Sequence, residues 1–411
     1  MTAPAEAPPP PPMSELRPAR PFEGGRSALV GGLLAGLVGT ALLVFGLFID
    51  AKQVFFSYLV AYAYLFALVL GAGAFVMSMH AASAIWSTAV RRLAEAVLAL
   101  LPLLVLLVVP IFLGAGFLYP WMHPERIARD EIRRLMLHRQ SYMNLPFVVL
   151  RAVAYFAFFL TVGVLLRRWS LRMDRPGARA ELLRLKGRMR VLSSLGLPAL
   201  AVFGTMASWD WLMSLSPDWY STMFGLYYLA GGFVAALGVI SFLAVLARRA
   251  GYLPEINDSH FYALGRLMFA FLVFWAYTSF WQFTLSWIAN RPMEAEWFWK
   301  RMQGGYGAVG LFIIFGHFGF PFFVLLSYWI KRRAWGITVM ALWLVAAHYF
   351  DVHWIIAAAR ERSNPFSWMD AAAVVAVGGF SLAFGVWRQR GVSLAPVYDP
   401  TFTRALEYES L

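Results

Sequence analysis

Ten long apolar segments are the feature that most restricts how this 411-residue chain can fold. They lie at about residues 27–49, 54–79, 93–116, 146–166, 191–212, 222–247, 261–289, 305–330, 335–352 and 369–387. Each is close to the length of about 20 residues with which an α-helix crosses a bilayer, and about twice that of a barrel strand. With 60% hydrophobic residues, the chain has more apolar side chains than a soluble fold can bury. The sequence predicts an all-α, polytopic integral membrane protein with about ten transmembrane helices.

The two ends of the chain differ from the apolar middle. The run from Pro8 to Pro12 is typical of extended, disordered conformations. We therefore expect a disordered proline-rich tail over residues 1–25, a transmembrane domain over 26–390 and a C-terminal tail over 391–411. The first apolar segment follows the prolines and is too long for a cleaved signal peptide.

Basic residues are divided unequally between the two sides of the membrane. With alternate loops on alternate sides, the side that holds both termini carries about twice as many Lys and Arg residues, which predicts cytoplasmic termini. The formal charge is +13, but only 14% of residues are charged, which indicates membrane anchoring and no nucleic-acid partner. The basic segment 167–190 includes Leu182, Leu183 and Leu185 and is predicted to form an amphipathic interfacial helix.

Cysteine is absent, which limits the redox chemistry of this chain. Disulfides, thiolate metal sites, covalently attached c-type haem and iron–sulfur clusters held by this chain are excluded. A b-type haem needs two histidines at matched depth, whereas the segments place His80 at the inner end, His317 centrally and His348 toward the outer end. We expect no metal site and no haem here, and any redox centres on partner subunits.

Ionisable side chains inside the apolar segments are functional candidates, because charge at membrane depth is costly. His348 and Asp351, near the end of the ninth segment, are three residues apart and share a helix face. A carboxylate beside an imidazole raises its basicity and fixes its tautomer, as a proton acceptor requires. Asp210 and Arg151 lie toward the same outer side. A structural interpretation stays open, since such groups also meet headgroups and water at helix ends.

His317 lies near the middle of the eighth segment, beside Gly316 and shortly before Pro321. A proline at membrane depth frees backbone groups that neighbours, water or a ligand must satisfy. The alternative is a neutral histidine bonded to a carbonyl of the next helix. In the seventh segment Thr278 and Gln282 are four residues apart on one polar stripe, a pattern that also joins helices.

Two further pairs have both a functional and a structural interpretation. Glu95 and His80 lie near the inner interface, where Glu95 is either a proton-uptake group or a partner of Arg91 four residues earlier. Tyr58 and Tyr62 share a face of the second segment, where they either serve the function or join neighbouring helices.

Four groups of residues together resemble one known family. They are SYLVAY at 57–62 with His80, Trp86, Arg91, Arg92 and Glu95; SWDWLMSL at 208–215 with WYSTMFGLYY at 219–228; FWAY at 274–277 with Gln282 and WIAN at 287–290; and GHF at 316–318 with Pro321. This pattern resembles the second quinone-binding membrane subunit of alternative complex III, a quinol:cytochrome c oxidoreductase, within the polysulfide-reductase membrane-subunit (NrfD-like) superfamily. The sequence departs from the family after Asn290, where an acidic pair is split into Glu294 and Glu296.

The resemblance implies two four-helix bundles plus two further helices, in a respiratory complex of the bacterial inner membrane that oxidises quinol, usually menaquinol, on the outer side. Its implied partners are a sister NrfD-like subunit, an iron–sulfur subunit, c-type cytochromes and, as a further candidate, a terminal oxidase. Haems and iron–sulfur clusters would lie on those partners, and this subunit would help to move protons, with no covalently bound cofactor and no catalytic residue of its own.

The candidate residues follow from these observations and from the resemblance. The proton-pathway candidates are His317, His348, Asp351, Asp210, Thr278, Gln282, Glu95 and His80, and the quinone-binding candidates are Tyr58, Tyr62, Arg151 and Trp209.

Two other functions remain open. A secondary transporter would bind its substrate at the midplane between discontinuous helices of two inverted halves. The eighth segment offers one such interruption, and no matching one is evident in the first half. A purely structural scaffold would tolerate neutral replacement of every buried polar residue.

Overall fold

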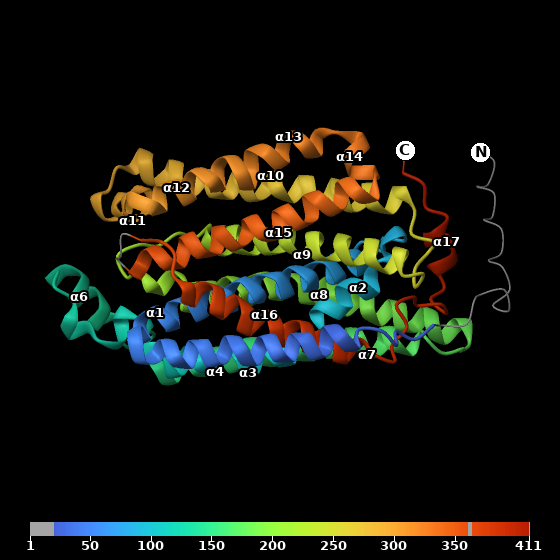
Figure 1. The fold of residues 1–411 in the computed structure, drawn as a ribbon, viewed down its shortest axis with the longest axis horizontal. Helices are drawn as coiled ribbons and strands as arrows, with labels where there is room; N and C mark the ends of the chain where they lie inside the picture. Colours follow the sequence, from blue (N-terminus) through green and yellow to red (C-terminus); the bar gives the residue numbers. More distant parts are fainter. Residues whose placement is uncertain (1–19, 361–363, 411) are drawn as a thin grey trace.

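The computed structural model describes residues 20–360 and 364–410, and α-helices dominate that part of the chain. Figure 1 shows the long helices lying side by side along the longest axis of the molecule. Nine helices within the described residues are long and apolar enough to cross a membrane. The prediction of an all-α polytopic membrane protein is confirmed.

The helices fall into two groups, continuous and interrupted. The continuous ones are α7 (Leu145–Arg172), α8 (Arg179–Trp211), α9 (Phe224–Arg249), α10 (Asp258–Ala289), α15 (Ala334–Ala357) and α16 (Trp368–Gln389), whereas α1 (Arg26–Ala81) is broken at Asp50. The interrupted ones are α2 to α5 (Arg91–Leu98, Leu101–Leu107, Val109–Leu113 and Ala115–Leu118) and α12 (Gly304–Phe312), a π-helical segment (Ile313–Gly319) and α13 (Phe320–Leu326).

The first helix, α1, forms two spans. Asp50 has non-helical backbone angles, with φ −157° and ψ 89°, and its carboxylate accepts a hydrogen bond of 3.0 Å from the backbone N–H of Gln53. Asp50 therefore caps the second arm as an N-cap residue does. The chain folds back there, so that a Cβ on Gly46 would lie 2.8 Å from Val54. Each arm is long enough to span the bilayer, which gives ten spans in the described part of the chain.

The spans form two bundles and one additional pair. The second arm of α1, α2 to α5, α7 and α8 form one bundle, and α9, α10, α12 to α13 and α15 form the other. The bundles meet where a Cβ on Gly71 would lie 2.3 Å from the carbonyl oxygen of Gly232. The first arm of α1 pairs with α16 through Gly32, Gly39 and Gly379, whose missing side chains let the two backbones approach closely.

Glycine at position 39 is required for this pairing. A Cβ there would lie 2.4 Å from the backbone nitrogen of Ala376, so Gly39→Ala must push α16 away and should destabilise the protein by about 1–3 kcal/mol. Gly31→Ala is the matched control, because nothing lies within 4 Å of its added Cβ. Thermal unfolding in detergent measures both, and equal midpoints for the two variants would contradict this account.

Two short helices mark each end of the molecule. Figure 1 places α6 (Asp130–His138) and α11 (Pro292–Met302) at one end, here called the α6 end, and α14 (Tyr328–Arg332) and α17 (Phe402–Leu406) at the other, the α17 end. The predicted interfacial helix over 167–190 is wrong, because α7 runs to Arg172 and α8 begins at Arg179. Leu182 and Leu185 are buried on α8, where they continue the apolar face of the fifth span.

The described parts of the two chain ends pair with each other. Residues 1–19 of the predicted disordered tail lie outside the described residues. Beyond them, Pro21 pairs with Ser393 in an isolated bridge, and the backbone N–H of Phe22 donates to the carbonyl oxygen of Val392 at 2.9 Å. The segment 391–410, which includes α17, folds across this end of the molecule (Figure 1).

Candidate functional site

A cluster of ionisable and aromatic side chains lies inside the second bundle. Asp351 on α15 accepts hydrogen bonds from the Tyr227 hydroxyl of α9 and, at 3.1 Å, from the Trp275 indole of α10. The nearest imidazole nitrogen of His348 lies 3.4 Å from the Asp351 carboxylate, and the His317 ring centroid lies 5.9 Å from that of His348. All three ionisable residues are buried, at 0–1% exposure. The structure brings the predicted residues His317, His348 and Asp351 together.

Local backbone features place the two imidazoles. The π-helical segment Ile313–Gly319 widens the eighth span by one residue in a turn, and π-turns of this kind concentrate at functional sites. It turns His317 inward against Trp275, with ring centroids 4.1 Å apart. On the other side, a Cβ on Gly231 would meet the His348 ring at 2.5 Å, so the glycine leaves room for that imidazole.

Both nitrogens of His317 and both of His348 are buried and make no hydrogen bond to any described residue. A neutral imidazole offers one donor and one acceptor nitrogen, and leaving both unmade is costly in a low dielectric. The carboxylate of Asp351 lies beside His348. The cluster therefore combines the residue types from which proton relays in membranes are built.

The predicted difference in depth between the two histidines is wrong. The ninth span does not end at Val352 but continues to Ala357, because polar residues near its end lower the hydropathy while the helix goes on. His348 thus lies about 21 Å from the start of α15 and level with His317. The depth argument against a shared haem fails with it, although no group of three or more ligands in the described residues could hold a metal ion.

The polar stripe of α10 lies beside this cluster. Thr278 donates to the carbonyl oxygen of Trp275 at 2.9 Å, within its own helix. Gln282 is buried and lines a cavity of about 1000 Å³ between α10 and α12, to which Tyr227 and Trp275 also contribute. The two residues that bind Asp351 therefore separate the cluster from this cavity.

A second histidine–aspartate pair lies between α15 and α16. The His353 ring nitrogen is 3.6 Å from the carboxylate of Asp370, which also accepts a 2.5 Å hydrogen bond from Ser57. Gln53 donates to Ser57 at 2.8 Å and accepts from Arg360. This network was not predicted from the sequence. Asp370 is the third residue after Ser367, the N-cap of α16, and an acidic residue at that position is usually explained as part of the cap.

Asp210 and Arg151 form a buried ion pair in the first bundle. Two guanidinium nitrogens of Arg151 donate to the two carboxylate oxygens at 2.8 Å, and Tyr155 donates a third bond of 2.8 Å. Arg151 also stacks over Tyr142, 3.9 Å from its ring centroid. Sequence analysis predicts separate roles for Asp210 and Arg151, whereas the structure shows the two side chains neutralising each other in the first bundle, away from the histidine cluster of the second.

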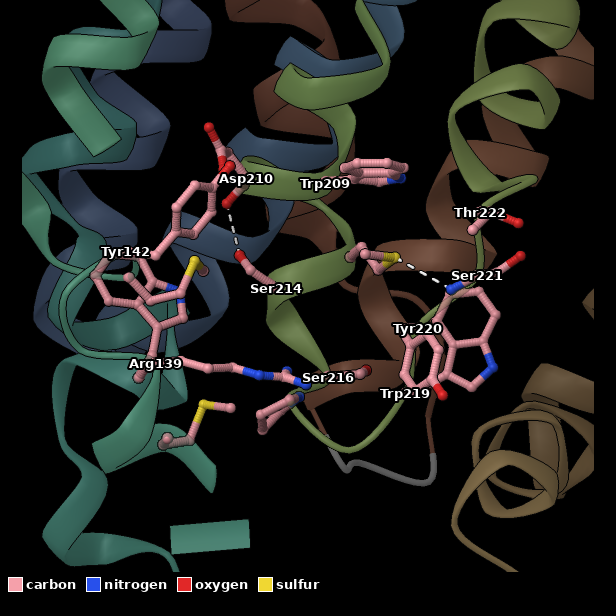
Figure 2. A pocket seen from close by; sticks show the side chains of 15 residues that line it. Arg139, Tyr142, Trp209, Asp210, Ser214, Ser216, Trp219, Tyr220, Ser221 and Thr222 are labelled. Carbon is pink, nitrogen blue, oxygen red and sulfur yellow. Dashed lines mark hydrogen bonds between the residues drawn. The ribbon is translucent and has the colours of Figure 1, made fainter. Parts of the chain in front are cut away.

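The ion pair borders a cavity of about 360 Å³ near the α6 end. Figure 2 shows Asp210 and Tyr142 on one side of it, Trp219 and Tyr220 on the other, and Arg139 extending across the bottom toward Ser216. Predicted quinone candidate Trp209 lines this cavity, and its indole N–H has no partner among the described residues.

The tyrosine candidates lie elsewhere. The Tyr58 hydroxyl donates to the carbonyl oxygen of Leu107 at 2.7 Å, and that of Tyr62 to Leu104 at 3.5 Å. Both hydroxyls therefore satisfy carbonyls in the interrupted third span. Neither tyrosine lines the two cavities described above.

Glu95 and His80 lie at the α17 end in a network of charges. Glu95 is bound by Arg91 at 3.1 Å and by Ser170 at 2.7 Å. Arg91 in turn binds Asp399 of the C-terminal segment at 3.1 Å, and His80 has a buried ring nitrogen without a partner in the described chain. The network fixes Glu95 in place and separates it from the histidine cluster.

Asp399 makes attachment of the C-terminal segment dependent on pH. Burial alone would raise the pKa of its carboxyl, but the charges of Arg91 and Lys186 outweigh burial and hold that pKa well below its usual value. A carboxyl with a lower pKa when folded contributes stability that is complete above the unfolded pKa, about 3.9, and disappears as the pH falls through the folded value.

We therefore expect residues 398–406 to keep constant hydrogen-exchange protection factors down to about pH 4 and to lose protection below it. The Asp399→Asn variant should show reduced protection at every pH. Wild-type protection factors that stay constant below about pH 4, or an Asp399→Asn variant with the same protection as the wild type, would contradict this role.

No protein-family model matches the chain, and no curated protein matches it either. Its class rests on its own fold and site. The chain is an all-α polytopic membrane protein with an ionisable cluster buried in its second bundle.

Proposed function

We propose that this chain is a proton-conducting membrane subunit of a respiratory quinol:cytochrome c oxidoreductase of the alternative complex III type. One observation carries the proposal: two imidazoles without hydrogen-bond partners in the described chain lie beside a carboxylate inside a membrane bundle. Ionisable residues in such positions commonly mark proton relays, because their burial is otherwise unfavourable. The assignment to this particular complex rests on the resemblance of the four sequence motifs to that family.

The chemistry assigns different tasks to this chain and to its partners. Oxidation of one quinol releases two electrons and two protons. The electrons pass to haems and iron–sulfur clusters on partner subunits, since this chain has no cysteine to hold an iron–sulfur cluster or a c-type haem. His348, stabilised by Asp351, takes up a proton and exchanges it with His317. His353 and Asp370 offer a second station toward the α6 end, beside Gln53 and Arg360.

The proposal places the α17 end and both termini in the cytoplasm of a bacterium. The basic connections gather on that side of the sequence, as the positive-inside rule requires. A reporter enzyme that works only in the cytoplasm should therefore be active when it is fused after Leu411, whereas one that works only outside the cytoplasm should be inactive there.

Co-purification tests membership of the complex. A tagged copy of the chain, taken from native membranes in mild detergent, should bring with it a multihaem cytochrome, an iron–sulfur protein and a second ten-span subunit, identified by mass spectrometry. Recovery of the chain alone or as a homodimer would overturn the proposal.

A secondary transporter is the second candidate, and one observation favours it. The third span is divided into α2 to α5 around Pro102 and Pro110, so an interruption that is not evident in the sequence exists in the first half. The prolines remove backbone donors within an unbroken apolar run, which hides the break from hydropathy. Recovery of the chain alone would place this function first.

A further inference from the structure

Arg301, in the last turn of α11, is a buried cation without a carboxylate partner. It is 2% exposed, and no ion pair joins it to an acidic side chain of the described residues. The nearby carboxylates Glu294 and Glu296 bind Arg291 and Arg129 instead. Burial lowers the pKa of Arg301 to about 9, while the charge of Asp218 opposes that shift. The guanidinium is therefore still protonated at neutral pH.

Backbone carbonyls hold Arg301 but do not neutralise it. Its terminal nitrogens donate to the carbonyl oxygens of Trp297 at 3.0 Å and Ile355 at 2.6 Å, and the guanidinium stacks on the Trp297 ring at 3.5 Å. These contacts use two of its five N–H donors, and its Nε has no partner in the described chain. A buried charge that has no carboxylate in direct contact is costly, unless a ligand supplies the counter-charge.

The cavity of about 1000 Å³ begins at Arg301 and continues into the membrane. Its walls are mainly apolar and aromatic, including Phe280, Leu311 and Ile314, which are 57–64% exposed and therefore open it toward the lipid. From Gly304 to Phe318 it follows about 21 Å of helix, more than the roughly 15 Å depth of one leaflet. The cation thus lies at the interface, and the apolar groove leads from it toward the midplane.

We propose that this groove binds one anionic phospholipid, with its phosphodiester at Arg301 and an acyl chain along α10 and α12. The order of charge and apolar wall is that of a lipid in its own leaflet. A net negative charge compensates Arg301, whereas a neutral carbonyl headgroup brings no charge and the ammonium of a zwitterionic lipid offsets its own phosphate. The inference goes beyond the proposed function and does not depend on it.

Titration of the delipidated full chain by native mass spectrometry tests this site. Dioleoyl phosphatidylglycerol should bind about tenfold or more tightly than dioleoyl phosphatidylcholine. Arg301→Gln should reduce the phosphatidylglycerol affinity to the phosphatidylcholine level, whereas Arg301→Lys should keep most of the preference. Arg291→Gln is the matched control, because Arg291 is the N-cap residue of the same helix but is 62% exposed, and it should behave as the wild type does.

A second variant tests the groove without touching the cation. Ala308 is exposed and lines the cavity, so Ala308→Phe fills the path of the acyl chain and should weaken both lipids. Millimolar inorganic phosphate should not displace phosphatidylglycerol, since a headgroup alone lacks the chain. Equal binding of the two lipids by the wild type, an unchanged preference in Arg301→Gln, or displacement by a menaquinone with a short tail would overturn the lipid assignment.

Discussion

An Asp210→Ala variant will be less stable than the wild type by about 3–5 kcal/mol, the usual cost of removing one partner of a buried ion pair. The reason is the charge that stays behind. Arg151 is 7% exposed and loses both of its 2.8 Å bonds to the carboxylate, while Tyr155 loses its acceptor. Unfolding of the purified protein in detergent, followed by tryptophan fluorescence, measures the loss.

Two comparisons separate charge from packing at this site. The double variant Arg151→Met, Asp210→Leu removes both charges and should recover most of the stability, because no ion is then left unpaired. Arg129→Ala breaks the ion pair with Glu296, which is partly exposed, and should change stability by no more than about 1 kcal/mol. A double variant as unstable as Asp210→Ala would contradict the explanation.

Asp351→Ala has the next largest expected effect, a loss of about 2–4 kcal/mol. The substitution leaves the Tyr227 hydroxyl and the Trp275 indole as buried donors without an acceptor. Asp351→Asn keeps a carbonyl oxygen at the same position and should lose less than half as much. The same unfolding assay compares them, and equal losses for the Ala and Asn variants would show that the hydrogen bonds do not stabilise this cluster.

The general fold could be predicted from the sequence because the bilayer requires it. Apolar runs of fixed length have one solution in lipid, a spanning helix, and the ten predicted segments correspond to the observed spans. Helical periodicity predicted that His348 and Asp351 share one face of the helix, and the structure shows the two residues buried as a pair. Local rules were sufficient for these predictions.

The partners of the polar residues could not be predicted in the same way. Arg151 and Asp210 are 59 residues apart and meet only because α7 and α8 pack together, and His317 meets His348 across two helices. Asp370 and Arg301 were missed for another reason. Each lies at a helix end, where a charged residue has a simpler interpretation as a cap or an anchor, so only packing reveals its burial.

The number of protons released per electron tests the central claim most directly. It should be measured in the assembled complex during quinol oxidation, with His317→Ala beside His138→Ala, an exposed histidine on α6 as the matched control. The account predicts that His317→Ala lowers the ratio while the complex still assembles and that His138→Ala leaves it unchanged. An unchanged ratio in a fully assembled His317→Ala complex would contradict the claim that this cluster conducts protons.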